Sequence, residues 1–140
     1  MTVELQPKEL TGKEKEFAEA AIENYKKVRD IMMFGNLYRI TSPYEGKGLY
    51  ALMHVSKDKK RAIAFNYCFE YQGRTHNSQS IKLNGLDPNK EYKMIELNVD
   101  KSNFEGNNKI FTGEYLINEG INPKLEKMYE SAVFSIEAID

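Results

Sequence analysis

The fold is decided at the segment GNLYRITSPYE, residues 35–45, where the hydrophobic pattern changes from a helical period to an alternating one. Before this segment, apolar residues recur at spacings of three and four, which is typical of an amphipathic α-helix. After it, short runs of alternating apolar and polar residues are separated by turn-forming residues, which is typical of β-strands. The segment therefore predicts a boundary between one helix and a β-domain.

The helix before this boundary has a start signal and a stop signal. Thr11 and Glu14 have the spacing of a capping box, in which each side chain accepts a hydrogen bond from the other residue's backbone N–H. Gly35 suits the left-handed conformation that often follows the last helical residue. The expected helix covers about residues 12–34. Its apolar stripe consists of Phe17, Ala21, Tyr25, Val28 and Met32, widened by Ile22, Ile31 and Phe34.

The rest of the chain predicts a mainly β fold. Turn signals such as Asn84-Gly85 and Gly106-Asn107-Asn108 divide it into short segments at roughly ten-residue spacing, which favours an antiparallel Greek-key β-sandwich. We expect a long amphipathic helix within residues 1–34 and a sandwich of about seven strands over residues 35–140. The candidate strands are Leu37–Thr41, Leu49–Ser56, Arg61–Tyr71, Ser80–Leu83, Tyr92–Val99, Gly113–Asn118 and Ala132–Ala138.

The third candidate strand, residues 61–71, has faces of different size. Large residues, from Ile63 and Phe65 to Tyr71, alternate with the small residues Ala62 and Ala64, with Asn66 and with Cys68. We expect the large side to fill the sandwich core and the small side to allow the helix to pack closely.

Composition excludes several classes of partner. The 140 residues suffice for one domain with a single core, and 20 basic against 21 acidic residues leave a net charge of -1. We therefore expect neither nucleic acid nor an anionic membrane as a partner. No apolar run reaches the roughly 18 residues of a membrane span, and the first residues show no signal-peptide pattern. The cellular compartment is left undecided, since the export signal would lie upstream of these residues if the chain is part of a longer protein.

The sequence offers no catalytic or metal-binding constellation. A glycosidase needs two carboxylates about 5 Å apart or more across the scissile bond. The five aspartates lie on the polar helix face, in turns, after a strand or at the last position, and Glu96 lies on a half-exposed strand face that suits pairing with a cation. His54 and His76 lack neighbouring ligands, and a buried, inert thiol is expected for Cys68. No nucleophile elbow or phosphate-binding loop occurs, so we predict no catalytic residue, no metal and no cofactor.

Sugar recognition needs only aromatic faces with polar neighbours, and one loop offers them. Tyr38, Tyr44 and Tyr50 flank this loop, with Arg39 and Glu45 between them. They are the candidate sugar-contact residues. The alternative is that these rings belong to the core or to an interface, with each hydroxyl reaching a partner.

Several blocks of sequence resemble one known family. The pattern Tyr-Lys-x-x-Arg at residues 25–29, followed by Gly-x-x-Tyr-Arg-x-x-Ser-Pro-Tyr at 35–44, resembles the junction between the last barrel helix and the C-terminal β-domain of α-galactosidases of glycoside hydrolase family 36. Three further blocks keep the order and spacing of that family. They are residues 53–58 with 61–65, residues 83–92 with 96–98, and residues 111–121 with 129–131.

The resemblance implies a supporting role. In that family the catalytic aspartates lie on a preceding (β/α) barrel, and no position of this chain corresponds to them. The implied function is a non-catalytic C-terminal β-domain of an enzyme that hydrolyses terminal α-galactosides, with the upstream barrel as partner. The helix would lose its barrel partner, so we expect it to dock on the β-domain or on a second copy of the chain. The open alternatives are a carbohydrate-binding module and a free-standing enzyme.

Overall fold

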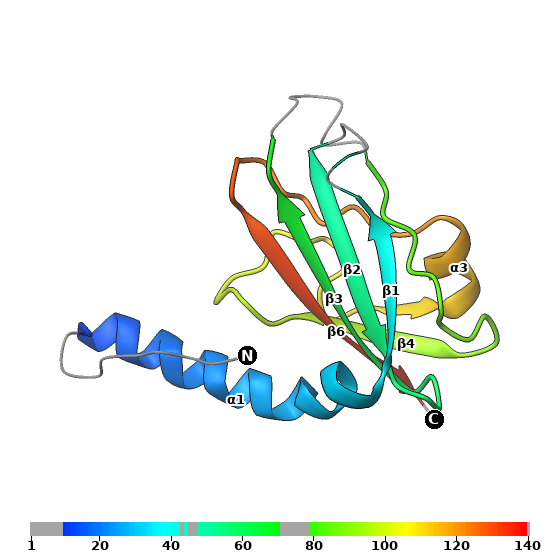
Figure 1. Ribbon diagram of the computed structural model, residues 1–140, viewed down its shortest axis with the longest axis horizontal. Helices are drawn as coiled ribbons and strands as arrows, with labels where there is room; N and C mark the ends of the chain where they lie inside the picture. Colours follow the sequence, from blue (N-terminus) through cyan, green and yellow to red (C-terminus); the bar gives the residue numbers. More distant parts are fainter. Residues whose placement is uncertain (1–9, 43, 45–47, 71–78, 140) are drawn as a thin grey trace.

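The computed structural model describes residues 10–42, 44, 48–70 and 79–139. Within these ranges, one long helix precedes six β-strands, and a second, short helix lies between the last two strands (Figure 1). The elements are α1 (Gly12–Phe34), β1 (Asn36–Thr41), β2 (Leu49–Val55), β3 (Arg61–Cys68), β4 (Glu91–Glu96), β5 (Ile110–Thr112), α3 (Gly113–Asn118) and β6 (Ser131–Ile139). The mainly β class with a preceding helix is confirmed.

The strands form one antiparallel sheet in the order β1-β2-β3-β6-β4-β5. The first three strands follow one another as hairpins, and β4 pairs with β5 in the same way. The departure from chain order comes from β6, which lies between β3 and β4. The described residues thus contain six strands in one sheet, where about seven in a sandwich were expected, and connecting segments with α3 cover the face that a second sheet would cover.

Two of the seven candidate strands form other structures. Of residues 80–83, only Ile81 pairs as in a sheet, through two hydrogen bonds of 2.7 and 3.0 Å with Ile121. Residues 113–118 form α3, because the Thr112 hydroxyl accepts a hydrogen bond from the backbone N–H of Tyr115 at 3.2 Å and so caps a helix. A strand does occur next to the predicted one, but it is β5, which ends at Thr112, directly before α3.

The capping box at the start of α1 is confirmed. The Thr11 hydroxyl accepts from the Glu14 backbone N–H at 3.4 Å, and the Glu14 carboxylate accepts from the Thr11 backbone N–H at 2.8 Å. The hydroxyl of Thr11 also donates to this carboxylate, and these hydrogen bonds hold the pKa of Glu14 below its ordinary value.

Gly35 ends α1, but not in the expected left-handed conformation. Its φ of -73° and ψ of 171° are extended, and its N–H donates to the carbonyl of Ile31 at 2.8 Å. A Cβ at this position would lie 2.4 Å from the Ile31 oxygen and 2.7 Å from the Val55 oxygen. Glycine is therefore needed because the end of the helix and the end of β2 approach too closely for a side chain.

The two faces of β3 are used the opposite way from the prediction. The small side faces the main core, and the large side, including Ile63 and Phe65, packs against α1. The register explains the difference, because Ala64 pairs with Met53 of β2 on one side and with Phe134 of β6 on the other. The side chains of Met53 and Phe134 fill the space beside Ala64 on the core-facing side of the sheet. A small residue therefore suits the core side of β3.

Tyr92 joins the start of β4 to the turn between β2 and β3. Its ring is fully buried, and its hydroxyl donates to the Lys59 carbonyl at 2.8 Å and accepts from the Asp87 N–H at 3.0 Å. Burial raises the pKa of the phenol. The phenol thus satisfies the hydrogen-bonding needs of two backbone groups beside the main core.

Candidate functional site

The face of the sheet opposite the main core, called here the helix-side face, is covered by α1 only in part. Val28 and Ile31 of α1 pack against Ile63 of β3. Two polar links hold the helix in place. Asn24 donates to the carbonyl of Leu97 at 3.0 Å. Arg61 pairs with Asp30 at 2.8 Å and also donates to the carbonyl of Lys27.

The first half of α1 lies outside this contact. Figure 1 shows the helix extending beyond the sheet at lower left. Phe17, the first member of the predicted apolar stripe, is 59% exposed, and Ala21 and Ile22 are exposed as well. Residues 24–32 thus make the closest contacts with the β-domain, while Phe17 and Ala21, before Asn24, line one end of a groove and remain exposed.

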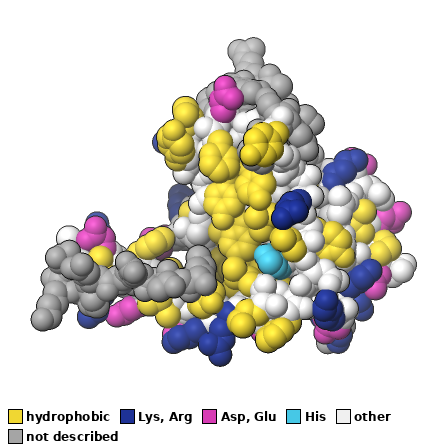
Figure 2. Space-filling view, viewed as in Figure 1, with side chains coloured by type: hydrophobic (Ala, Val, Ile, Leu, Met, Phe, Trp, Pro, Cys, Tyr) yellow, Lys and Arg dark blue, Asp and Glu magenta, His cyan; other side chains and the backbone are white. Residues whose placement is uncertain are grey.

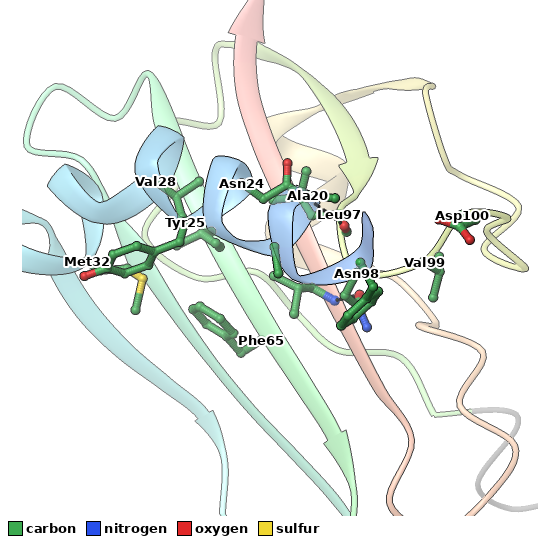
Figure 3. Close-up of a pocket in the computed structure, with 14 residues that line it drawn as sticks. Ala20, Asn24, Tyr25, Val28, Met32, Phe65, Leu97, Asn98, Val99 and Asp100 are labelled. Carbon is green, nitrogen blue, oxygen red and sulfur yellow. Dashed lines mark hydrogen bonds between the residues drawn. The ribbon is translucent and has the colours of Figure 1, made fainter. Parts of the chain in front are cut away.

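A groove of about 210 Å³ lies between α1 and the sheet. In Figure 3, Tyr25, Val28 and Met32 approach it from the helix, and Phe65 and Leu97 from the sheet side. Asn98 fixes the wall beyond β4, because its side chain donates to the Ser131 carbonyl at 2.9 Å and accepts from the Val133 N–H at 2.7 Å. The groove is therefore a mostly apolar surface open to solvent, with one wall anchored through Asn98.

Three aromatic rings extend this apolar surface along the sheet. Tyr50 and Tyr67 are stacked with ring centroids 6.1 Å apart, and Phe69 lies 6.3 Å from Tyr50 and 6.4 Å from Tyr67. We call these three residues the aromatic cluster. Tyr67 follows Phe65 of the groove on the same side of β3, and Figure 2 shows a continuous band of hydrophobic side chains over this region. Burial, with a smaller contribution from Tyr50, raises the pKa of Tyr67.

The three tyrosines selected from the sequence do not share one face. Tyr38 pairs with Met53 and so lies on the main-core side, where its ring covers Gly85 so closely that a Cβ there would lie 2.4 Å from a ring carbon. Tyr50 belongs to the aromatic cluster on the opposite side. Tyr44 is 96% exposed. Tyr67 was missed as a binding candidate, although the large side of residues 61–71 was the signal that could have found it.

The acidic, histidine and cysteine side chains form no candidate metal centre in the ranges that the structure describes. These ranges hold no group of three or more His, Cys, Asp or Glu residues placed to bind a metal ion. Glu96 accepts a hydrogen bond from the Ser102 hydroxyl. Burial lowers the pKa of His54 and raises that of the buried Cys68 thiol. Neither helix of the described chain has the length and hydropathy to cross a membrane.

Fold and surface together define an antiparallel β-domain led by a helix, with a continuous apolar face beside that helix. Residues 49–136 match the sequence model of the glycosyl hydrolase family 36 C-terminal domain. The chain belongs to this family.

Similar proteins in this family are much longer than the chain. The α-galactosidase AgaA of Geobacillus stearothermophilus is 34% identical over 96 residues, covering 69% of this chain and 13% of AgaA. A probable α-galactosidase C of Aspergillus flavus is 28% identical over 135 residues, covering 96% of this chain and 16% of that protein. The crystal structure of AgaA superposes with a TM-score of 0.79 at 28% identity, covering 97% of this chain and 17% of that one. The chain thus spans between 13% and 17% of these relatives.

Proposed function

We propose that the chain is the non-catalytic C-terminal β-domain of an α-galactosidase-like glycoside hydrolase, in which it packs against the catalytic domain and stabilises it. Two findings support this. The family is that of a C-terminal domain, and the chain matches only a small share of each α-galactosidase. The parent reaction would be retaining hydrolysis of terminal α-linked galactose.

The observation that carries this proposal is the uncovered half of the apolar stripe on α1. Helices expose such a stripe to water only at a cost, since each buried Å² of apolar surface contributes about 25 cal/mol. Phe17 projects from the part of α1 that no strand covers, and the groove and aromatic cluster continue the same surface. A contiguous exposed apolar surface of this kind marks an interaction site.

Adjacent residues of α1 provide a matched test of the packing role. Phe17→Lys places a cation on the apolar stripe, while Glu16→Lys places the same side chain on the exposed, polar side of the same turn. With the parent's catalytic domain produced separately, the wild-type chain and Glu16→Lys should co-elute with it in gel filtration with light scattering. Phe17→Lys should bind at least about tenfold more weakly, because a buried, unpaired charge is costly.

Three outcomes would contradict parts of the proposal. Equal binding by both variants would remove α1 from the interface, and a stable dimer of the isolated chain that hides Phe17 would make a second copy the partner. Turnover of an aryl α-galactoside by the purified chain would contradict the non-catalytic role and favour a free-standing enzyme.

A carbohydrate-binding role is the second candidate, and the aromatic cluster is the observation that favours it. Tyr50 and Tyr67 present stacked, half-buried rings to solvent. Titration with galactose, melibiose and raffinose should then perturb the chemical shifts of these two tyrosines, and Tyr50→Ala should abolish the response. The same spectra report the chemical shifts of Tyr38 and Tyr44, the other two candidate sugar-contact residues. Shifts that stay unchanged at all four tyrosines would exclude this role for the predicted residues.

A further inference from the structure

A second concave region lies away from α1, beside α3 at the right of Figure 1. It is an open depression with a volume of about 380 Å³, within the roughly 300–1,000 Å³ of small-molecule sites. Its walls come from the segment before β5, from the β5–α3 junction and from residues 120–124. We call it the α3 pocket. It belongs to neither the groove nor the aromatic cluster, since it shares no residue with them.

One wall of the α3 pocket is aromatic. Phe111 of β5 and Tyr115 of α3 are stacked with ring centroids 5.8 Å apart and an angle of 17° between their planes. Tyr115 remains 46% exposed, so its ring is open to a ligand. Gly106 allows this arrangement, because a Cβ there would lie 2.4 Å from Phe104 Cζ and 2.7 Å from Phe111 Cζ. Because the two rings are stacked on one another, the apolar surface left open to a ligand is that of the exposed Tyr115 ring, with Phe111 supporting it.

The rim of the α3 pocket carries charges of both signs. Lys124 and Glu105 form an ion pair of 3.5 Å that joins two of the walls. Lys109 also lines the pocket, and its ammonium has no ion-pair partner among the described residues. Ammonium groups only donate hydrogen bonds and carboxylates only accept them. The rim therefore offers both a hydrogen-bond acceptor, at Glu105, and donors, at Lys109 and Lys124, which are the two kinds of partner that hydroxyl groups use, with one positive charge in excess.

We propose that the α3 pocket binds one ring of a neutral, polyhydroxylated ligand such as a pyranose. The apolar face of the ring lies on the wall formed by Phe111 and Tyr115. The hydroxyl groups donate to the Glu105 carboxylate and accept from the Lys109 and Lys124 ammonium groups. This site is independent of the packing role proposed above, so a failure of either proposal leaves the other in place.

The test uses the full chain and galactose as the probe, followed by chemical-shift changes. A single sugar ring is expected to bind with a Kd on the order of 1 mM, from about 0.3 kcal/mol for each of its roughly twelve non-hydrogen atoms. Tyr115→Ala should weaken binding about tenfold, and Tyr115→Phe should stay within about twofold of the wild type, because the stacking surface is kept. Met33→Ala, at an exposed position of α1 that lines neither the groove nor the α3 pocket, should leave the affinity unchanged.

A second variant covers the case in which Tyr115→Ala does not fold. Lys109→Ala alters only the exposed rim and should weaken galactose binding by about threefold to tenfold, the loss expected for one hydrogen bond. Galacturonate, which adds a negative charge to the same ring, should bind no better than galactose. The proposal is overturned by an absence of saturable binding, by binding that survives both Tyr115→Ala and Lys109→Ala, or by a tenfold preference for galacturonate.

Discussion

Phe134→Ala is expected to lower the free energy of unfolding by about 3–5 kcal/mol. Phe134 is fully buried in the middle of β6, and its ring centroid lies 4.8 Å from that of Phe104. On the neighbouring strand its partner is Ala64, which is too small to fill the space that the ring would leave. The substitution therefore removes apolar contacts and leaves a cavity at the junction of the two halves of the sheet.

Urea denaturation followed by circular dichroism measures this loss. Phe69→Ala is the matched control, because it makes the same chemical change at a ring that is 51% exposed, and it should cost less than about 1 kcal/mol. A typical domain has a stability of about 5–15 kcal/mol, so Phe134→Ala should bring the chain close to the limit of folding. Equal losses for the two variants would show that Phe134 is not a centre of the core.

Gly35→Ala is expected to cost about 3 kcal/mol, although it adds only one methyl group. Overpacking costs about 1–3 kcal/mol where side chains can move aside. Here the obstacles are the backbone oxygens of Ile31 and Val55, at 2.4 and 2.7 Å from the added carbon, so the helix end and β2 must separate. That separation disturbs the contact of Val28 and Ile31 with the sheet.

Gly12→Ala is the control for this substitution. A Cβ at Gly12, the first residue of the same helix, meets nothing within 4 Å. Because alanine has the higher helix propensity, the thermal midpoint should stay the same or rise slightly. Gly35→Ala should lower it by several degrees. A Gly35→Ala variant as stable as the wild type would mean that the junction between α1 and β1 is loose.

Helix α1 could be predicted closely because its signals are local. The cap at Thr11 and Glu14, the stripe and the stop at Gly35 all lie within or beside the helix, and the structure gives Gly12–Phe34. The reason for the glycine could not be predicted, because Val55 approaches it from a strand twenty residues away. Glycine is favoured both where a left-handed conformation is needed and where there is no room for a Cβ. At Gly35 only the second cause applies.

The short helix α3 was predicted as a strand because six residues cannot establish a period. Tyr115, Leu116 and Ile117 are apolar in succession, which fits a buried strand as well as a helix. The decision lies in the Thr112 hydroxyl, which caps the helix, and in the burial of Gly113 and Leu116 at helical spacing. The threonine at the N-cap and the acidic Glu114 in the first turn were the local signs, and both are too common to decide the structure.

The grouping of the tyrosines failed because their faces depend on register. Tyr38 and Tyr50 lie on adjacent antiparallel strands, and Tyr38 pairs with Met53. Met53 is three residues from Tyr50, an odd number, so the two rings point to opposite sides of the sheet. The register of β1 with β2 includes an irregularity between Arg39 and Thr41, which sequence spacing does not reveal. For the same reason the pairing of Tyr50 with Tyr67 emerged only from the structure.

The position of β6 in the sheet has a consequence for biosynthesis. β1–β3 form one antiparallel group and β4–β5 another, and β6 is the only strand of the described chain that joins them. During synthesis, β3 and β4 each lack a neighbouring strand until residues 131–139 have left the ribosome. Unpaired strand edges are prone to pair with other chains. The sheet can be completed only after residues 131–139 have left the ribosome, so chaperone demand for this domain should be greatest just before this strand is released.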